Sequence, residues 1–379
     1  MPDSTNKFHG AIAPTEAIIE AAKAGRMFIL VDDEQRENEG DLVIPAEMAD
    51  AAAVNFMAKH GRGLICLSMT RERVEHLGLP FMARSNGTRH QTAFTVSIEA
   101  REGVTTGISA ADRARTIEVA IDPAMNAGDI VSPGHVFPLM ARDGGVLVRA
   151  GHTEAAVDVS RLAGLNPAGV ICEIMNDDGT MARTPELIEF AARHDLLIGT
   201  IADLIAYRLR HDRLVEKSLE SDFSSIHGGA WRMVIYTNRV NGAEHVALIK
   251  GDVGDGAPVL ARVHGLQLLD DLLGDETHGR GEELHQAMRM VAAEGRGVVL
   301  LLREPLPSSL SDRLRARLEN RDEPVVLRDY GVGAQILLDL GVRDMILLSN
   351  SQKTIAGLEE GYGLRVVERR KIAAKGENI

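Results

Sequence analysis

Met27–Val31, with the sequence MFILV, leads directly into Asp32–Asp41, with the sequence DDEQRENEGD. The first stretch predicts a buried β-strand, because it is a short and unbroken run of apolar residues. The second carries six carboxylates in ten residues, which is unfavourable unless a cation lies among the negative charges. Loops that leave a rigid strand often carry chemistry, and hard cations such as Mg²⁺ take oxygen ligands. A solvated acidic turn is the alternative, but Arg36 and Gly40 among the acids favour a site.

The segments around this strand alternate between helical and strand-like patterns. A helix is expected over His152–Leu162 and a strand over Gly169–Met175. Later in the chain, Trp231–Tyr236, His245–Lys250 and Val259–His264 have the pattern of short antiparallel strands. The alternation predicts an α/β fold of the mixed α+β kind, with an α/β domain first and an α+β domain second.

The 379 residues suggest two domains, at roughly 100–200 residues per domain. Ser218–Gly229, with the sequence SLESDFSSIHGG, is polar, rich in Ser and Gly and aperiodic, which predicts a linker. The expected division is therefore a first domain over residues 1–217, a linker over 218–229 and a second domain over 230–379.

Composition excludes several classes of protein. The net charge is −13 and no dense Lys/Arg run occurs, which argues against nucleic acid or a membrane as partner. Cys66 and Cys172 are the only cysteines, so a disulfide framework and a multi-cysteine zinc site are excluded. The sequence has no apolar run of membrane-spanning length and no signal-peptide pattern at residues 1–10. We therefore expect a cytoplasmic protein.

Further candidate residues lie outside the acidic stretch. Arg149–Glu154, with the sequence RAGHTE, runs into the predicted helix, where a guanidinium and a helix N-terminus suit an anion. A simple helix cap is the alternative there. His135 follows a Pro-Gly turn and could move protons, and Glu173 lies within an apolar strand. Cys66 is expected in the core, the usual place for a free cysteine.

A resemblance to the 3,4-dihydroxy-2-butanone 4-phosphate synthase family of riboflavin biosynthesis is carried by five stretches. They are residues 32–43 (DDEQRENEGDLV), 103–113 (GVTTGISAADR), 132–139 (SPGHVFPL), 149–158 (RAGHTEAAVD) and 168–183 (AGVICEIMNDDGTMAR). Taken together, the resemblance covers nearly all of residues 10–213 in order. It implies conversion of D-ribulose 5-phosphate to 3,4-dihydroxy-2-butanone 4-phosphate and formate by a homodimer. Mg²⁺ is the implied cofactor, and whether Mn²⁺ substitutes is left open.

The resemblance also implies roles for individual residues. The metal-binding positions correspond to Glu37 and His152, and the positions essential for catalysis to His135 and Glu173. The substrate-binding positions correspond to Arg36, Glu37, Asp41, Arg149, Ala150, Gly151, His152, Thr153 and Glu173. Asp32 and Cys66 resemble secondary positions of the site. The density of motifs around Thr105 and Thr106, rather than the resemblance, makes these two residues candidates to supply hydroxyls near the sugar.

The second half resembles GTP cyclohydrolase II, notably over residues 244–248, 258–264, 293–297 and 327–342. That family holds a catalytic zinc with three cysteines, and the matching positions here are Gln267, His278 and Arg280. An arginine cannot lose its proton to bind zinc, and glutamine is a poor ligand. We therefore expect a degenerate domain that binds no zinc and lacks cyclohydrolase activity.

Three alternatives remain open at this point. The second domain could still hydrolyse GTP with unusual ligands, which would make the enzyme bifunctional. It could instead bind a nucleotide as a regulatory module. The residues of the first domain, taken without the resemblance, would also suit a general metal-dependent sugar-phosphate isomerase or aldolase.

Overall fold

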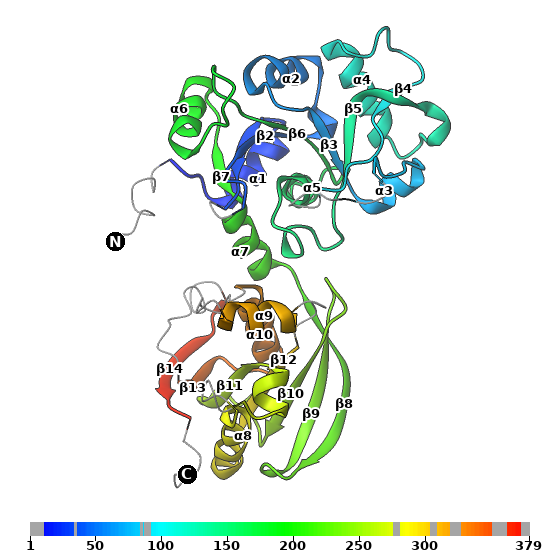
Figure 1. Ribbon diagram of the computed structural model, residues 1–379. Coiled ribbons are helices and arrows are strands. Elements are labelled where there is room, and N and C mark those ends of the chain that lie inside the picture. The colour runs from blue at the N-terminus through cyan, green and yellow to red at the C-terminus, as the bar shows by residue number, and fades with distance from the viewer. Residues whose placement is uncertain are drawn as a thin grey trace. The chain divides into compact units, whose positions relative to one another are not determined.

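The structure is a computed structural model that describes residues 11–33, 36–83, 86, 92–275, 281–303, 309–318, 327–350 and 362–372. The chain divides into two compact units, Met1–Arg208 and Leu209–Ile379, and each is described by itself (Figure 1). Over the described ranges, no helix has both the length and the apolar character that a membrane span requires.

A mixed sheet forms the centre of the first unit, with strand order β4-β5-β3-β6-β2-β1-β7. Its strands are β1 (Phe28–Val31), β2 (Gly40–Pro45), β3 (Cys66–Met69), β4 (Ile98–Ala100), β5 (Ile130–Met140), β6 (Ala168–Glu173) and β7 (Ile198–Thr200). Antiparallel and parallel pairs both occur: β1 pairs antiparallel with β2 and parallel with β7. The mixed α/β architecture expected from the alternating pattern is confirmed.

Helices cover both faces of this sheet. They are α1 (Thr15–Lys23), α2 (Ala51–Phe56), α3 (Arg71–His76), α4 (Ala110–Ile121), α5 (His152–Leu162), α6 (Thr184–His194) and α7 (Ile201–His211). Successive residues of β1 enter opposite cores: Phe28 packs with α1, α5 and α7, whereas Ile29 packs with α2, α4 and α6. A strand buried on both faces needs apolar residues at every position, which is why Met27–Val31 shows no alternation.

The second unit is built on a sheet of order β14-β13-β11-β12-β10-β9-β8. Its strands are β8 (Val215–Ser225), β9 (Gly229–Asn238), β10 (Glu244–Lys250), β11 (Val259–Gly265), β12 (Gly297–Leu302), β13 (Asp344–Leu348) and β14 (Arg365–Arg370). The helices are α8 (Glu283–Glu294), α9 (Ser309–Leu318) and α10 (Leu327–Asp339). Leu284, Met288 and Val291 of α8 pack against Trp231 and the central strands.

Two expectations for this half are wrong. Ser218–Gly229 was expected as a linker, but Ser218–Ser225 belongs to β8 and pairs antiparallel with β9. Because β8 is an edge strand with residues 216–224 exposed, it needs no apolar face, and charged residues are usual on such edges. Val259–His264 forms β11 as a strand, but its ladders with β12 and β13 are parallel rather than antiparallel.

Candidate active site

The acidic loop closes the hairpin between β1 and β2. Val31 pairs with Gly40 and Leu30 with Asp41, so the loop enters and leaves at one edge of the sheet. Asp32 is buried, and its carboxylate accepts hydrogen bonds from the backbone N–H of Glu37 (3.2 Å) and of Glu39 (2.9 Å). The carboxylate of Asp32 therefore shapes the loop that presents Glu37.

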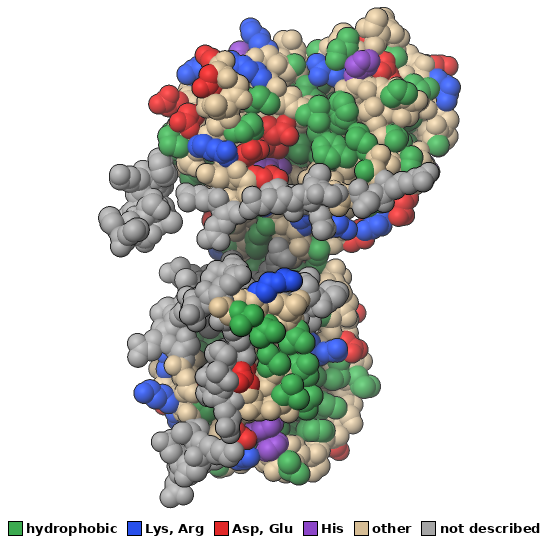
Figure 2. Space-filling view, viewed as in Figure 1, with side chains coloured by type: hydrophobic (Ala, Val, Ile, Leu, Met, Phe, Trp, Pro, Cys, Tyr) green, Lys and Arg blue, Asp and Glu red, His purple; other side chains and the backbone are tan. Residues whose placement is uncertain are grey.

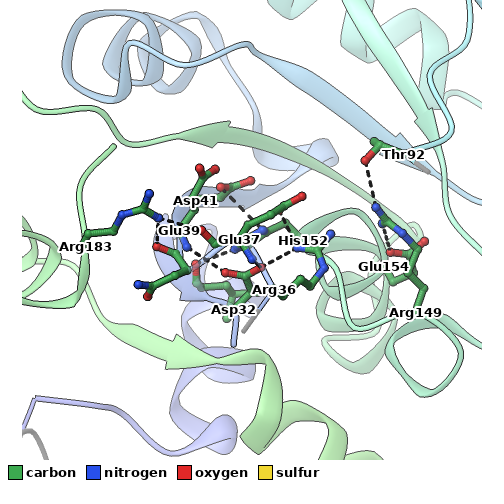
Figure 3. A network of polar contacts seen from close by, with 12 residues as sticks. Asp32, Arg36, Glu37, Glu39, Asp41, Thr92, Arg149, His152, Glu154 and Arg183 are labelled. Atoms are coloured by element: carbon green, nitrogen blue, oxygen red, sulfur yellow. Dashed lines mark hydrogen bonds and ion pairs between the residues drawn. The ribbon is translucent and has the colours of Figure 1, made fainter. Parts of the chain in front are cut away.

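Asp32, Glu37 and His152 come together although 115 residues separate the last two (Figure 3). One ligand atom of each lies within 4.8 Å of the others, a spacing that can hold a metal ion. Nη1 of Arg36 lies 2.6 Å from both Asp32 Oδ2 and Glu37 Oε2, so it is the cation among these carboxylates in the structure. Figure 2 shows one patch of acidic side chains near the centre of this face of the first unit, with other acidic side chains scattered around it.

The ring of His152 has a defined tautomer. The residue is the first of α5 and is buried, and burial lowers the pKa of its imidazole. Nε2 lies 3.1 Å from the backbone carbonyl oxygen of Leu30, which can only accept, so Nε2 carries the proton. The lone pair is then on Nδ1, which faces Asp41 Oδ1 at 3.8 Å. A lone pair held in this way is the form in which histidine binds metals.

Asp41 is fully buried, and within the described part of the chain its Oδ1 has no hydrogen-bond partner. Burial raises the pKa of this carboxyl group well above its usual range, and the charges of Glu173 and Glu37 add to the effect. Burial and the charge of Glu37 also raise the pKa of Glu39. A buried oxygen that faces a nitrogen lone pair calls for a proton or a cation, so the donor set fits a hard metal ion.

Glu173 lies opposite Asp41 in the ladder between β2 and β6. It is the last residue of β6 and half-buried, rather than inside the strand as expected. Its Oε2 accepts a 2.8 Å hydrogen bond from the backbone N–H of Leu64. A Cβ at Gly63 would lie 2.5 Å from that oxygen, so only glycine allows this close approach.

The stretch from Arg149 to Thr153 leads into α5, with Gly151 as the N-cap residue. The guanidinium of Arg149 donates to Glu154 Oε2 at 2.6 Å and to Thr92 Oγ1 at 3.0 Å. Glu154 is buried, and burial raises the pKa of its carboxyl group against the opposing effect of Arg149. Thr153 is buried and Ala150 is half-buried beside this group. The N-terminus of α5 and a fixed guanidinium thus lie together, an arrangement that suits an anion.

His135 and the two threonines lie in a second group. His135 Nδ1 is 2.9 Å from Glu99 Oε2, and among the described residues no hydrogen bond or ion pair links it to Asp32, Glu37 or His152. β3 lies between β5 and β6, so the strands that carry His135 and Glu173 are about 10 Å apart across the sheet. Oγ1 of Thr105 donates to Asp112 (2.8 Å), and Thr106 is exposed.

Cys66 lies in the core, as expected for a free cysteine. Burial raises the pKa of its thiol well above the usual range, and the charges of Glu173 and Asp41 raise it further. Burial also raises the pKa of Cys172, to about 12. Both groups therefore stay protonated at neutral pH and are poor nucleophiles.

Several residues of these groups were not singled out from the sequence. Arg183 donates from Nη1 to the backbone carbonyls of Glu37 and Asn38, which ties α6 to the acidic loop. Glu39 belongs to the acidic stretch and Glu154 to the Arg149–Glu154 stretch, but Arg183 and Glu99 have no local signal because their partners lie far away in the sequence. Only the pairing of strands brings these residues to the site.

A sequence model of the 3,4-dihydroxy-2-butanone 4-phosphate synthase family matches residues 16–207. The chain belongs to this family. Residues 216–371 match a second model, that of GTP cyclohydrolase II. The chain therefore joins a 3,4-dihydroxy-2-butanone 4-phosphate synthase domain to a domain of the GTP cyclohydrolase II family.

Two relatives that match over most of this chain support this assignment. The chain is 51% identical over 366 residues to the 3,4-dihydroxy-2-butanone 4-phosphate synthase of Pseudomonas aeruginosa, a match over 94% of this chain and 98% of that protein. It is 50% identical over 371 residues to "Riboflavin biosynthesis protein RibBA" of Synechocystis sp., a match over 93% of this chain and 66% of that protein.

Solved structures agree with the assignment to the synthase family. RibBX, a two-domain 3,4-dihydroxy-2-butanone 4-phosphate synthase from A. baumannii, superposes with a TM-score of 0.78 at 40% identity, over 96% of this chain and 100% of that one. A synthase crystallised with two magnesium ions has a TM-score of 0.51 at 40% identity, over 53% of this chain and 99% of that one. The protein is thus a synthase, a lyase of riboflavin biosynthesis.

Proposed function

We propose that the first unit converts D-ribulose 5-phosphate to 3,4-dihydroxy-2-butanone 4-phosphate and formate, with Mg²⁺ bound by Glu37 and His152. The observation that carries this proposal is the cluster of Asp32, Glu37 and His152, whose ligand atoms lie within 4.8 Å of one another. Asp32 joins Glu37, an oxygen donor, and His152, a nitrogen donor, as a third ligand. The unpartnered Oδ1 of Asp41 beside His152 supports a cation at this place.

The reaction needs protons to move while negative charge develops on neighbouring oxygens. When bound, Mg²⁺ polarises those oxygens and stabilises the charge on them. Glu173 and His135 are the groups to which we assign proton transfer, first from the carbon beside the ketone and then during loss of water. Rearrangement of the carbon skeleton and hydration then release the excised carbon as formate, so substrate and products balance.

The substrate is held by groups on both sides of the cluster. Arg36 contacts Glu37 and Asp41 faces His152, and we assign both to the hydroxyl and carbonyl groups of the sugar. The phosphate is assigned to Arg149, Ala150, Gly151 and Thr153, since the N-terminus of α5 and the guanidinium both favour an anion. Cys66 and Thr106 are secondary residues of the site in this proposal.

Substitution of Glu37 tests the metal assignment. Glu37→Gln keeps the size of the side chain but removes its charge, so Mg²⁺ affinity and formate release should both fall by about a hundredfold or more. Calorimetric titration with Mg²⁺ and a formate assay measure the two effects. Glu47→Gln, at an exposed position on the same unit, is the control and should match the wild type. Unchanged Mg²⁺ binding in Glu37→Gln would show that the assignment is wrong.

The finer properties of the synthase belong to the same proposal. We assign it to the cytoplasm as a homodimer, with Mg²⁺ as the ion used and Mn²⁺ as the substitute to test. Sedimentation of the full chain checks the homodimer. Formate assays with each metal check which ion is used.

For the second unit we propose a cyclohydrolase-type fold without zinc and without GTP hydrolysis. No cysteine follows Cys172 in the sequence, and His278 and Arg280 lie outside the described residues. Gln267 donates its backbone N–H to Asp271 Oδ2 at 2.7 Å. Both ring nitrogens of His264 are engaged, Nδ1 with Arg262 (3.1 Å) and Nε2 with Asp271 (2.9 Å), which leaves no nitrogen for a metal.

Two other functions of the second unit must also be tested, because the chain resembles the relative named RibBA. They are GTP hydrolysis and nucleotide binding without turnover. Formate release from GTP together with stoichiometric bound zinc would overturn the proposal. Calorimetric titration of the full chain with GTP separates a nucleotide-binding module from a purely structural one. The proposed outcome is no formate from GTP and no zinc in metal analysis.

A further inference from the structure

β5, the strand that carries His135, loses its pairing with β4 over residues 132–135. In the pair β4–β5, Ile98 lies opposite Val136, whereas the next residue of β4, Glu99, lies opposite Val131. Residues 132–135 therefore have no partner in β4 and form a bulge. A Cβ at Gly134 would lie 2.0 Å from the carbonyl oxygen of Ile98, so the bulge is packed tightly against the backbone of β4. Oγ of Ser97 also accepts the backbone N–H of Gly134 at 3.2 Å.

Glu99 contacts the ring of His135, the last residue of this bulge. Oε2 of Glu99 lies 2.9 Å from Nδ1, with the carboxylate side chain 13% exposed and the imidazole 44% exposed. An ionised carboxylate can only accept a hydrogen bond, so Nδ1 carries a proton. In the neutral ring the lone pair is then on Nε2. The mostly buried acid thus orients a mostly accessible base.

The same carboxylate touches the turn that carries the two threonines. A Cβ at Gly107 would lie 1.6 Å from Oε1 of Glu99, so the carboxylate lies directly against the backbone of this glycine. Asp112 holds the other side of the turn, accepting from the backbone N–H of Thr105 at 3.1 Å and of Gly107 at 3.0 Å. Glu99 therefore contacts both the bulge with His135 and the turn with Thr106.

We propose that Glu99 is a positioning residue of the synthase reaction. It holds the imidazole of His135 in the tautomer whose Nε2 accepts a proton, and it keeps the ring beside the Thr105–Gly107 turn. Glu99 acts through His135 and touches no substrate. This inference rests on the proton-transfer role proposed above for His135, so the two must be tested separately.

A double-mutant cycle separates the positioning role of Glu99 from the proton-transfer role of His135. Glu99→Gln keeps the shape of the side chain, but the amide can both donate and accept, so the choice of tautomer is lost. We expect kcat to fall by about tenfold to a thousandfold, with KM changed by less than about threefold. His135→Gln should lower kcat at least as much. The double variant should equal His135→Gln within about twofold, since one residue acts through the other.

Nitrogen NMR of the full-length protein labelled with ¹⁵N-histidine gives a readout that does not depend on turnover. The signals of His135 are assigned by their loss in His135→Gln. The wild type should show an unprotonated Nε2 in the neutral ring, and Glu99→Gln should show a mixture of tautomers. Glu102→Gln, at an exposed position three residues further along, is the matched control and should leave both the spectrum and kcat unchanged.

Each outcome decides between the two assignments. Full turnover by His135→Gln would show that this histidine transfers no essential proton, and the role of Glu99 would fall with it. A reduced kcat in His135→Gln together with an unchanged tautomer in Glu99→Gln would overturn the role of Glu99 alone. Losses that multiply in the double variant would likewise show that Glu99 acts independently of His135.

Discussion

Oδ1 of Asp41 lies 3.8 Å from Nδ1 of His152, and both side chains are buried. The nitrogen presents a lone pair because Nε2 donates to Leu30, and the oxygen has no partner among the described residues. Two acceptors facing each other out of water destabilise the folded state until a positive group lies between them. The site is thus prepared for a cation at a cost in stability.

Removing the charge of Asp41 should therefore stabilise the metal-free protein. The amide of Asp41→Asn can donate to His152 Nδ1, and the free energy of unfolding without Mg²⁺ should rise by about 1–3 kcal/mol. Formate release should be lost in the same variant. Differential scanning calorimetry in chelator measures the first effect, with Glu47→Gln as the exposed control. A lower melting temperature for Asp41→Asn would contradict this account of the site.

A methyl group at Gly151 should weaken substrate binding. Its Cβ would lie 2.5 Å from Nη1 of Arg149, so the guanidinium must leave the position set by Glu154 and Thr92. The φ of Gly151 is −121°, which alanine adopts without strain. We expect KM for ribulose 5-phosphate to rise about tenfold, as for one lost charged hydrogen bond. Gly265→Ala, where no atom lies within 4 Å of the added carbon, should leave KM unchanged.

Acid should destabilise the second unit through His245. Burial lowers the pKa of its imidazole to about 4, and the charge of Arg303 adds to the effect. In the unfolded chain this imidazole binds its proton below about pH 6.5. Above that pH it is neutral in both states, so its lowered pKa does not change the free energy of unfolding. Between about pH 6.5 and pH 4 the unfolded state binds the extra proton, and unfolding becomes easier by up to about 3 kcal/mol.

Fluorescence can follow this loss in one unit alone. Trp231 is the single tryptophan of the chain and is buried in the core of the second unit. Urea unfolding followed by its emission should show a free energy that falls over this pH range. His245→Gln should flatten that fall, whereas His76→Gln, at an exposed position in the first unit, should not. An identical pH dependence in wild type and His245→Gln would contradict the prediction.

Sequence patterns predicted those parts of the site that are local. A strand running straight into an acidic loop, and a Gly-His pair at the start of a helix, are features of neighbouring residues. Asp32 and Glu37 from the first and His152 from the second do lie together. The roles assigned to these residues remain predictions.

What depended on strand order could not be predicted. Asp41 and Glu173 oppose each other because β2 and β6 are neighbours, and no pattern within either strand shows that register. Glu99 meets His135 only through a bulge in β5. The polar strand β8 was mistaken for a linker because the usual strand signal is burial on one face, and an edge strand can lack it.

The hydrogen bond from His152 to Leu30 joins the first turn of α5 to β1, two elements of the same core. A cation bound to the free nitrogen of this ring would therefore be bound by the folded chain and released on unfolding. Its binding free energy then becomes part of the folding free energy, so a hundredfold excess over the dissociation constant adds about 2.7 kcal/mol. Metal supply would then govern how long the first unit survives in the cell as well as how fast it turns over.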